Sequence, residues 1–284
     1  MPPGEQPNKP LPPPRQVKLP HHHLRSLASD LQSLHRTPLQ PRAPTKPIDV
    51  VCISDTHGTR PLIPPGDLLL HAGDLTQWGT FAEIQAQLAW LSAQPHTHKV
   101  VIAGNHDLLL DSDFRTQHPD RWHEAIKAAR STEEEVVAEE KSEQDLDWAG
   151  VVYLRNTSTT LTFWDRTLTI YGSPLTPQHG LSAHQHPKDQ DVWSYAVPPN
   201  TDILLTHGPP WGHLDGFKKS GCPFLTREVV RSRPRLVVFG HIHVGYGSEE
   251  RVFDTVGRAH EGIVGGWASW GALPQWWQLW RGAE

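Results

Sequence analysis

Side chains that bind metal ions follow short apolar runs of this sequence, at the point where each run ends. The last of these runs stops at Gly240 and is followed by His241 and His243. In an extended chain, residues two apart point to the same face, so these imidazoles can serve one metal ion or two adjacent ions. Four earlier runs are followed by carboxylates, imidazoles and an amide, namely Asp55 with His57, then Asp74, Asn105 and His207. Donors of these types are the inventory of a metal site.

The number of candidate ligands indicates a pair of metal ions. Three or four ligands satisfy one zinc-like ion, whereas this chain offers seven candidates. Two ions can share a bridging carboxylate, and mixed nitrogen and oxygen ligands favour Mn, Fe or Zn over Mg or Ca. Two such ions about 3.5–4 Å apart can hold a hydroxide between them and neutralise a phosphoryl group from both sides.

Each motif taken alone has an ordinary structural explanation. A D-x-H triplet occurs by chance, a histidine after a strand is more often a capping or core residue, and a Gly-Asp pair usually marks a turn. All of them together are hard to explain as packing, because burying so many unpaired polar groups is costly.

The apolar runs that position these residues have the composition of buried strands. Each is short, β-rich or wholly apolar, and bounded by turn residues, which is typical of strands buried on both faces. The runs are residues 48–54, 67–73, 99–104, 201–206 and 235–240. A helical period over 80–94 separates the second from the third and predicts parallel pairing with a right-handed crossover. Ligands of open α/β sheets bind beyond the carboxyl ends of the strands, so one edge would receive all these polar residues.

The segment between the third and fourth runs contains two further features. Residues 111–150 are polar and acidic, and they predict a helix with an exposed loop, inserted into the domain. Residues 150–174 alternate apolar and polar side chains, which predicts a hairpin with one half-buried face.

The two ends of the chain differ from this body in composition. Residues 1–47 are rich in proline and poor in aromatic residues, which predicts a disordered tail. Residues 251–284 hold five of the 12 tryptophans and predict a helical extension of the domain that spans 48–250. Either end is a candidate site for a protein partner, because exposed aromatic clusters usually mark interfaces.

Composition restricts the class of partner and the expected location. The net charge of −5 gives no reason to expect binding to nucleic acid. Only two cysteines are present, so a disulfide framework is excluded, and Cys52, inside an apolar run, is expected to be a core residue. No stretch approaches the roughly 18 apolar residues that span a membrane, and the N-terminus lacks the apolar segment of a signal peptide. These features predict an intracellular protein, cytoplasmic by default, and the sequence does not choose between cytoplasm and nucleus.

In this order, the motifs ISDTHG, HAGDLT, VIAGNHD, LLTHGPP and FGHIH resemble those of the calcineurin-like metallophosphoesterase superfamily. Its pattern is D-x-H, G-D, G-N-H-[DE], a lone histidine and G-H-x-H. The wording of YGSPLTP, TDILLTHGPPWGHLD and FGHIHVGYG is similar to its metallophosphoesterase-domain-containing (class III phosphodiesterase-like) subfamily. The resemblance covers about residues 48–248. It implies an α/β fold in which a two-sheet β sandwich is flanked by helices, in four αββα layers.

The resemblance also implies a role for each motif residue. One metal ion would be held by Asp55, His57, the bridging Asp74 and His243. The second would share Asp74 and add Asn105, His207 and His241. The G-N-H histidine, His106, would lie over the substrate phosphate as a catalytic general acid, the alternative being a hydrogen-bonding support. Asp107 is expected to be catalytic through orienting His106 or its loop, and substrate contacts are expected from Asn105 and His106. Trp211, which follows His207 closely, is a further candidate for substrate contact by stacking on a base, the alternative being plain packing.

The function implied is metal-dependent hydrolysis of a small phosphoester, with phosphodiesters preferred and a nucleotide as one candidate. A metal-bridging hydroxide would attack phosphorus in line with the leaving oxygen. One alternative is a phosphomonoesterase, although the sequence LTQWG after Gly73-Asp74 lacks the arginine that the family's protein phosphatases carry there. Another is a metal-binding scaffold that recruits partners through its ends. A nuclease would show a basic groove or a capping domain, and the sequence contains neither.

Overall fold

A computed structural model of the chain describes residues 46–129, 141–251 and 261–262. The chain divides into two compact units, one formed by Thr37–Arg251 and the other by Met1–Arg36 with Val252–Glu284. The predicted proline-rich tail lies almost wholly outside the described residues, as does the tryptophan-rich extension. The sheets and the named helices all belong to the first unit.

The first sheet of this unit is parallel throughout. Its strands lie side by side in chain order, as β1 (Val50–Ile53), β2 (Leu68–His71), β3 (His98–Val101) and β4 (Val152–Tyr153). Helix α2 (Phe81–Ser92) connects β2 to β3. The strand–helix–strand prediction with parallel pairing is therefore confirmed.

Helix α2 begins at a capping box. The hydroxyl of Thr80 accepts a hydrogen bond from the backbone N–H of Glu83, whose carboxylate accepts one from the backbone N–H of Thr80. This exchange satisfies donors that a helix start leaves unpaired. Ile84, Leu88 and Leu91 recur at helical spacing and are fully buried, so one face of α2 packs on the sheet.

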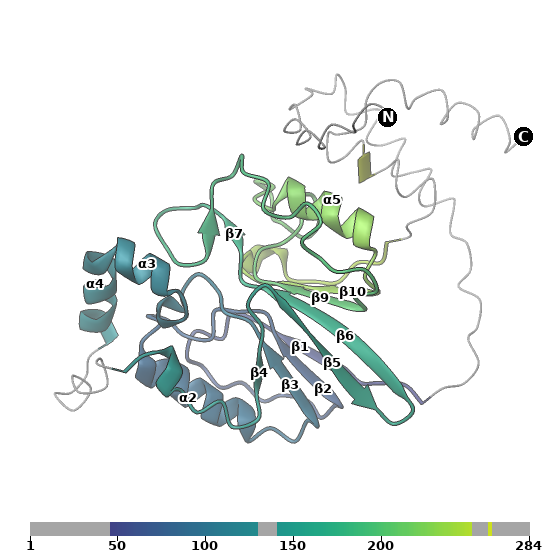
Figure 1. Cartoon of the computed structure of the whole chain (residues 1–284), viewed down its shortest axis with the longest axis horizontal. Helices are drawn as coiled ribbons and strands as arrows, with labels where there is room; N and C mark the ends of the chain where they lie inside the picture. Colours follow the sequence, from purple (N-terminus) through teal and green to yellow (C-terminus); the bar gives the residue numbers. More distant parts are fainter. Residues whose placement is uncertain (1–45, 130–140, 252–260, 263–284) are drawn as a thin grey trace, which may run out of the picture. The chain divides into compact units, whose positions relative to one another are not determined.

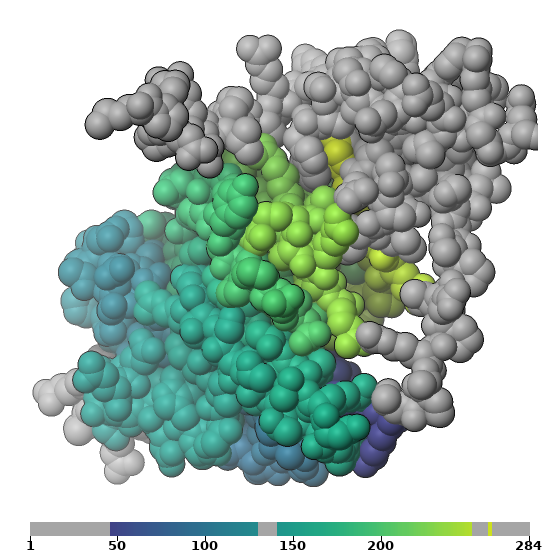
Figure 2. Space-filling view, turned by 45° about the vertical axis from the view of Figure 1, so that its right-hand side comes forward, coloured from purple at the N-terminus to yellow at the C-terminus, as the bar shows by residue number. Residues whose placement is uncertain are grey.

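The second sheet is mixed. Strands β5 (Thr157–Phe163) and β6 (Arg166–Ser173) form the predicted antiparallel hairpin. Strand β9 (Ile203–Thr206) pairs with β6 and with β10 (Leu236–Val238), both times in parallel. Helix α5 (Pro223–Ser232) connects β9 to β10. In Figure 2 the hairpin and the segment after it, coloured teal to green, cover much of one face of the unit.

The main core lies between the two sheets. Leu68 and Leu70 of β2 point to this side, where they meet Ile170 of β6 and Leu205 of β9. Leu69, between them, points to the opposite side and packs in the cluster under α2. Figure 1 shows α2 beyond the first sheet and α5 beyond the second. The layers are therefore helix, sheet, sheet and helix, which confirms the predicted fold class.

The remaining described elements are short. The insertion forms α3 (Ser112–Gln117) and α4 (Pro119–Ala129), and residues 130–140 within it lie outside the described part. Strands β4, β7 (Thr176–Pro177) and β8 (Gln185–His186) are two residues long, and β7 pairs with β8. The single-turn 3₁₀ helices are η1 (Leu108–Leu110), η3 (Glu143–Asp145) and η4 (His243–Gly245).

Two of the five apolar runs are not buried on both faces. Within the described residues, β1 and β10 each pair on one side only, and both are largely half-buried, whereas β2 and β9 are buried throughout. Cys52 lies on the edge strand β1 and is exposed, so its prediction as a core residue is wrong. An apolar run does not reveal which strand of a sheet is at the edge, because that depends on distant pairing.

The part of the chain that the structure describes contains no helix long and apolar enough to cross a membrane.

Candidate metal centre

The polar residues that follow the strands meet at one place. Three groups of side chains can be distinguished. Within each group, the three ligand atoms all lie within 4.8 Å of one another. The groups are Asp55 with His57 and His243, His57 with Asp74 and His106, and Asp74 with His207 and His241. Asn105 joins the last group, because its Oδ1 lies 3.1 Å from Nε2 of His207. The structure therefore brings together all seven predicted ligands, and His106 lies beside them.

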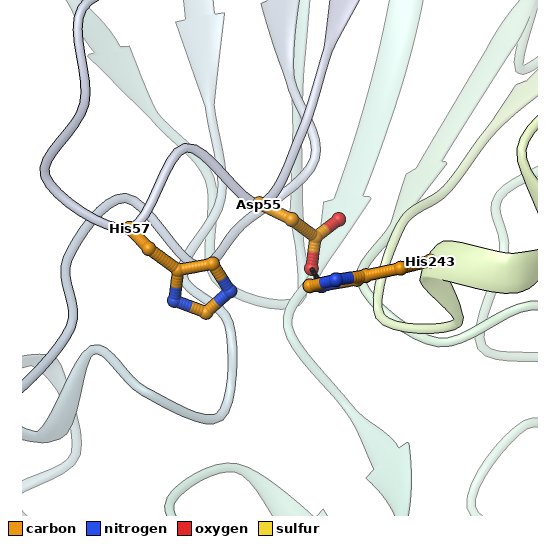
Figure 3. A group of neighbouring side chains, drawn as sticks. All are labelled: Asp55, His57 and His243. Atoms are coloured by element: carbon orange, nitrogen blue, oxygen red, sulfur yellow. Dashed lines mark ion pairs between the residues drawn. The ribbon is translucent and has the colours of Figure 1, made fainter.

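The first group is open to solvent on one side. Asp55 and His57 come from the loop after β1, and His243 comes from the segment after β10 (Figure 3). Nε2 of His243 lies 3.4 Å from Oδ1 of Asp55, and the His243 side chain is 63% exposed. Figure 3 shows the three side chains gathered around one point between the two loops. Solvent therefore reaches this group from the side of His243.

The group of Asp74, Asn105, His207 and His241, called the second group from here on, is buried except for His241, which is half-buried. His207 follows β9 and is fully buried, and Asp74 and Asn105 beside it are buried as well. The imidazoles of His207 and His241 have centroids 5.0 Å apart and meet edge to face. A desolvated set of carboxylate, amide and imidazole donors of this kind is costly without a cation to compensate it.

Asp74 touches both groups with different oxygen atoms. Its Oδ1 lies 3.3 Å from Nε2 of His207, and its Oδ2 lies 3.8 Å from Nε2 of His57. The backbone N–H of His106 donates to Oδ1 at 2.8 Å and fixes the carboxylate plane. The two oxygens of Asp74 therefore face different imidazoles, Oδ1 that of His207 and Oδ2 that of His57.

Three imidazoles are fixed by backbone carbonyls. Nδ1 of His57 lies 3.2 Å from the carbonyl oxygen of Thr76, and Nδ1 of His207 lies 2.8 Å from that of Ala72. Nδ1 of His106 lies 2.9 Å from the carbonyl oxygen of Gln77. A carbonyl oxygen only accepts hydrogen bonds, so each Nδ1 carries a proton, and in the neutral ring Nε2 keeps its lone pair. Such support is typical of histidines that bind metals.

Four of the predicted ligands have left-handed backbone conformations. Their φ angles are 53° for Asp55, 45° for His57, 52° for Asp74 and 69° for His241. Residues other than glycine rarely adopt this region, and such strain gathers at functional sites where surrounding contacts enforce it. Here the enforcing contacts include the bond from the backbone N–H of His241 to Oδ2 of Asp55, at 3.0 Å.

Gly104 and Gly240 lie so close to neighbouring ligand side chains that only glycine fits at either position. A Cβ atom at Gly104, before Asn105, would collide with the carboxylate of Asp74 and the ring of His207. A Cβ atom at Gly240 would collide with the carboxylate of Asp55. Glycine at these positions therefore lets one strand end approach the ligands of its neighbour.

Charge is distributed unevenly over the second group. Burial alone would raise the pKa of Asp74, but the charge and hydrogen bond of His207 hold that pKa well below its usual range. Burial would likewise lower the pKa of His207, but the carboxylate of Asp74 raises it to about 9. Burial lowers the pKa of His241 to about 4. Without metal, a proton on Nε2 of His207 therefore occupies the centre of this group.

We expect the metal-free protein to lose stability as the pH rises from 6.5 to 9. The folded-state pKa of His207 lies above its ordinary value of 6.5, so its protonated form stabilises the fold below pH 6.5, and this contribution is lost as the pH passes through 9. The loss should be on the order of 3 kcal/mol. Urea unfolding after chelation measures it, and His207→Gln should flatten the dependence. Equal slopes for both proteins would contradict this assignment of charge.

The predicted catalytic pair His106 and Asp107 point in different directions. The ring of His106 lies edge to face against that of His57, with centroids 4.7 Å apart, at the rim of the first group. Asp107 is fully buried and accepts four hydrogen bonds. The donors are the backbone N–H groups of Leu75, Thr76 and Gly104 and the hydroxyl of Thr76.

The contacts of Asp107 define what its carboxylate does. It ties the loop after β2, which carries Asp74, to the loop after β3, which carries Asn105. Burial and then the charge of Asp74 raise the pKa of Asp107 to about 6, and the four donors oppose this, so the group is ionised at neutral pH. The observed contacts of this buried carboxylate are all with the two loops.

Trp211 is half-buried on the loop after β9. The ammonium group of Lys219 lies 4.8 Å from the centre of its ring, so one face of the indole is engaged by a cation. That face is not free to stack on a base.

Sequence reasoning missed the residues that support the ligands. Thr76 holds His57 through its carbonyl oxygen and Asp107 through its hydroxyl. The position of Thr76, two residues after Asp74, is only a weak indication in the sequence that it supports the site. Ser182 contacts Asn105 across 77 positions of sequence, and no local pattern marks it.

Comparison with known proteins agrees with this geometry. The family model described as calcineurin-like phosphoesterase matches residues 48–245. Metallophosphoesterase domain-containing protein 1 of Homo sapiens is 38% identical over 210 residues, which cover 69% of this chain and 61% of that protein. The probable rhamnogalacturonate lyase C of Emericella nidulans is 40% identical over 251 residues, which cover 87% of this chain but 22% of that protein. The lyase name thus describes a protein most of which lies outside the similarity.

A more distant likeness is seen among solved structures. The phosphopantetheinyl hydrolase of Mycobacterium tuberculosis has 17% identity and a TM-score of 0.39, over 69% of this chain and 83% of that chain. The family model, in contrast, spans more than half of the sequence and includes every predicted ligand. The chain therefore belongs to the calcineurin-like phosphoesterase family, and the resemblance predicted from its motifs is confirmed.

Proposed function

We propose that the chain is a hydrolase of phosphodiesters that uses a dinuclear metal centre. The observation that carries this proposal is the carboxylate of Asp74, whose two oxygens face two different ligand groups. Asp55, His57, Asp74 and His243 would hold one ion, and Asp74, Asn105, His207 and His241 would hold the other.

The donor set fits transition metals. Imidazole and carboxylate donors together suit Mn, Fe or Zn, and the carbonyl partners of His57 and His207 leave the correct nitrogen free. When bound, the two ions would supply a nucleophile at neutral pH and neutralise the charge of the phosphoryl group.

His106 is the group that we propose for proton transfer. Its Nδ1–H donates to the carbonyl oxygen of Gln77, which leaves Nε2 to face the ligand groups. Water attacks phosphorus in line, the bond to the leaving ester oxygen breaks, and Nε2 of His106 gives its proton to that oxygen. Asn105 and His106 would contact the substrate phosphate. Trp211 has one ring face engaged by Lys219 and contributes at most an edge or its other face.

Charge favours a diester over a monoester. A phosphate monoester carries roughly −1.5 to −2 at neutral pH, whereas a diester carries a single charge. In the described part of the chain, the ion pairs of Asp55 and Asp74 are formed with histidines and not with arginine or lysine. A nucleotide diester is one candidate substrate.

The test compares two esters on protein stripped of metal and reloaded with Mn²⁺. We expect bis-p-nitrophenyl phosphate to be cleaved faster than p-nitrophenyl phosphate, and cleavage to depend on the metal. His106→Ala should lower kcat by about 10²–10⁴-fold, more for diesters with poorer leaving groups. The matched control is His98→Ala, at the start of β3 and away from the ligands. No turnover of either ester would favour a metal-binding scaffold that recruits partners.

A further inference from the structure

The loop between β7 and β8 contacts Asn105 through Ser182. The hydroxyl of Ser182 donates to the backbone carbonyl oxygen of Asn105 at 2.5 Å, and Nδ2 of Asn105 lies 3.4 Å from the same hydroxyl oxygen. We propose that Ser182 is a positioning residue that orients the amide of Asn105, so that its oxygen faces the second metal ion. The inference rests on the dinuclear centre proposed above.

The single proton of Ser182 decides the orientation. A serine hydroxyl has one donor and two lone pairs. Because its proton is committed to the carbonyl oxygen of Asn105, the hydroxyl can only accept from the side chain of Asn105. It therefore favours Nδ2 and disfavours Oδ1 on its side, which places Oδ1 on the opposite side.

The opposite side is the second ligand group. Oδ1 of Asn105 lies 3.1 Å from Nε2 of His207, which in turn lies 3.3 Å from Oδ1 of Asp74. A flipped amide would present two N–H donors to this point and repel a cation. The orientation of the amide thus determines whether Asn105 binds the second metal ion through Oδ1 or repels it through its N–H groups.

The two residues that follow Ser182 are fixed by hydrogen bonds. The backbone N–H of Ala183 donates to the same carbonyl of Asn105 at 3.2 Å, and Ala183 is fully buried. The backbone N–H of His184 donates to Oδ2 of Asp111 at 2.7 Å. The carbonyl of His184 accepts from the backbone N–H of Thr176 at the start of β7. The hydroxyl therefore reaches Asn105 from a fixed backbone, and it is half-buried.

The expected effect is on one metal ion and not on the other. Groups that orient metal ligands typically contribute 10–100-fold to affinity, and the contact of 3.4 Å is long. We therefore expect Ser182→Ala to weaken the second Mn²⁺ about tenfold, while the first keeps its affinity because none of its ligands contacts Ser182. Ser182→Thr keeps the hydroxyl and should restore the second affinity.

The experiment titrates metal-stripped, folded protein with Mn²⁺ and follows both binding steps by calorimetry. The spin coupling of a Mn²⁺ pair, seen by electron paramagnetic resonance, reports occupancy of both sites without reference to activity. Leu181→Ala, an exposed neighbour in the same loop, is the matched control and should leave both steps unchanged. Equal affinities for wild type and Ser182→Ala would overturn the proposal. If wild type itself binds fewer than two ions, the dinuclear centre fails instead.

A second variant separates orientation from general loosening of the loop. Asn105→Asp replaces the amide by a carboxylate with oxygen at both ends, so there is no wrong orientation to prevent. Ser182→Ala should then have no further effect on the second step. A tenfold loss in both backgrounds would show that Ser182 acts through loop stability and would also overturn the proposal. Unfolding midpoints of all variants confirm that each one folds.

Discussion

Asp74→Asn is expected to abolish turnover, lowering kcat for bis-p-nitrophenyl phosphate by at least about a thousandfold. The substitution changes one oxygen of the shared carboxylate into an N–H donor and removes its charge. Since Oδ1 faces His207 and Oδ2 faces His57, either orientation of the new amide damages one of the two ligand groups. Metal content should fall below two ions per chain, as measured by elemental analysis after dialysis.

The control for this prediction is Asp202→Asn. Asp202 also accepts a backbone hydrogen bond, from Thr169 at 2.9 Å, but it precedes β9 and lies at the end of the strand away from the ligands. It should keep its activity and its metal content. Two tightly held ions with normal turnover in Asp74→Asn would rule out a bridging role for this carboxylate.

Asp107→Asn is expected to lower the free energy of unfolding of the metal-free protein by about 2–4 kcal/mol. The carboxylate is fully buried and accepts four hydrogen bonds, with two donors at each oxygen. In the Asp107→Asn variant the amide nitrogen would replace one of the two carboxylate oxygens. Its N–H groups would then face two hydrogen-bond donors, which would be left buried without an acceptor. Urea unfolding after chelation measures this loss separately from the stabilisation that a bound metal provides.

Asp145→Asn is the matched control for Asp107→Asn. Asp145 accepts hydrogen bonds from Ser142 at the start of η3, but it is exposed to solvent. Water can replace those bonds, so little change in unfolding is expected. An equally small change in Asp107→Asn would mean that its carboxylate does not tie the two loops together. A loss of turnover without any loss of stability would indicate contact with the substrate.

Much of the fold could be predicted from the sequence because its signals are local. The apolar period of α2 and the alternation of β5 and β6 each lie within one element. The ligands were predictable for a similar reason, since each follows its own strand and parallel strands end at one edge.

The features that sequence reasoning missed depend on contacts between distant segments. Cys52 is exposed because β1 lies at the edge of its sheet, which no property of the run VVCI reveals. Asp107 follows His106 directly, but the turn after β3 sends the two side chains in different directions. Ser182 reaches Asn105 from the loop between β7 and β8, and only the folded chain brings them together.

The position of the ligands at the join between the two sheets has a mechanical consequence. Asp55, His57, Asp74 and Asn105 extend from the first sheet, whereas His207, His241 and His243 extend from the second. Each of the two proposed metal sites draws on both sheets, so two bound ions would link the sheets across the sandwich. The affinity of the centre for metal ions would then depend on how the two sheets are aligned. A slightly smaller side chain at Leu70 or Ile170, deep in the shared core, would be felt as weaker metal binding at a site that neither residue touches.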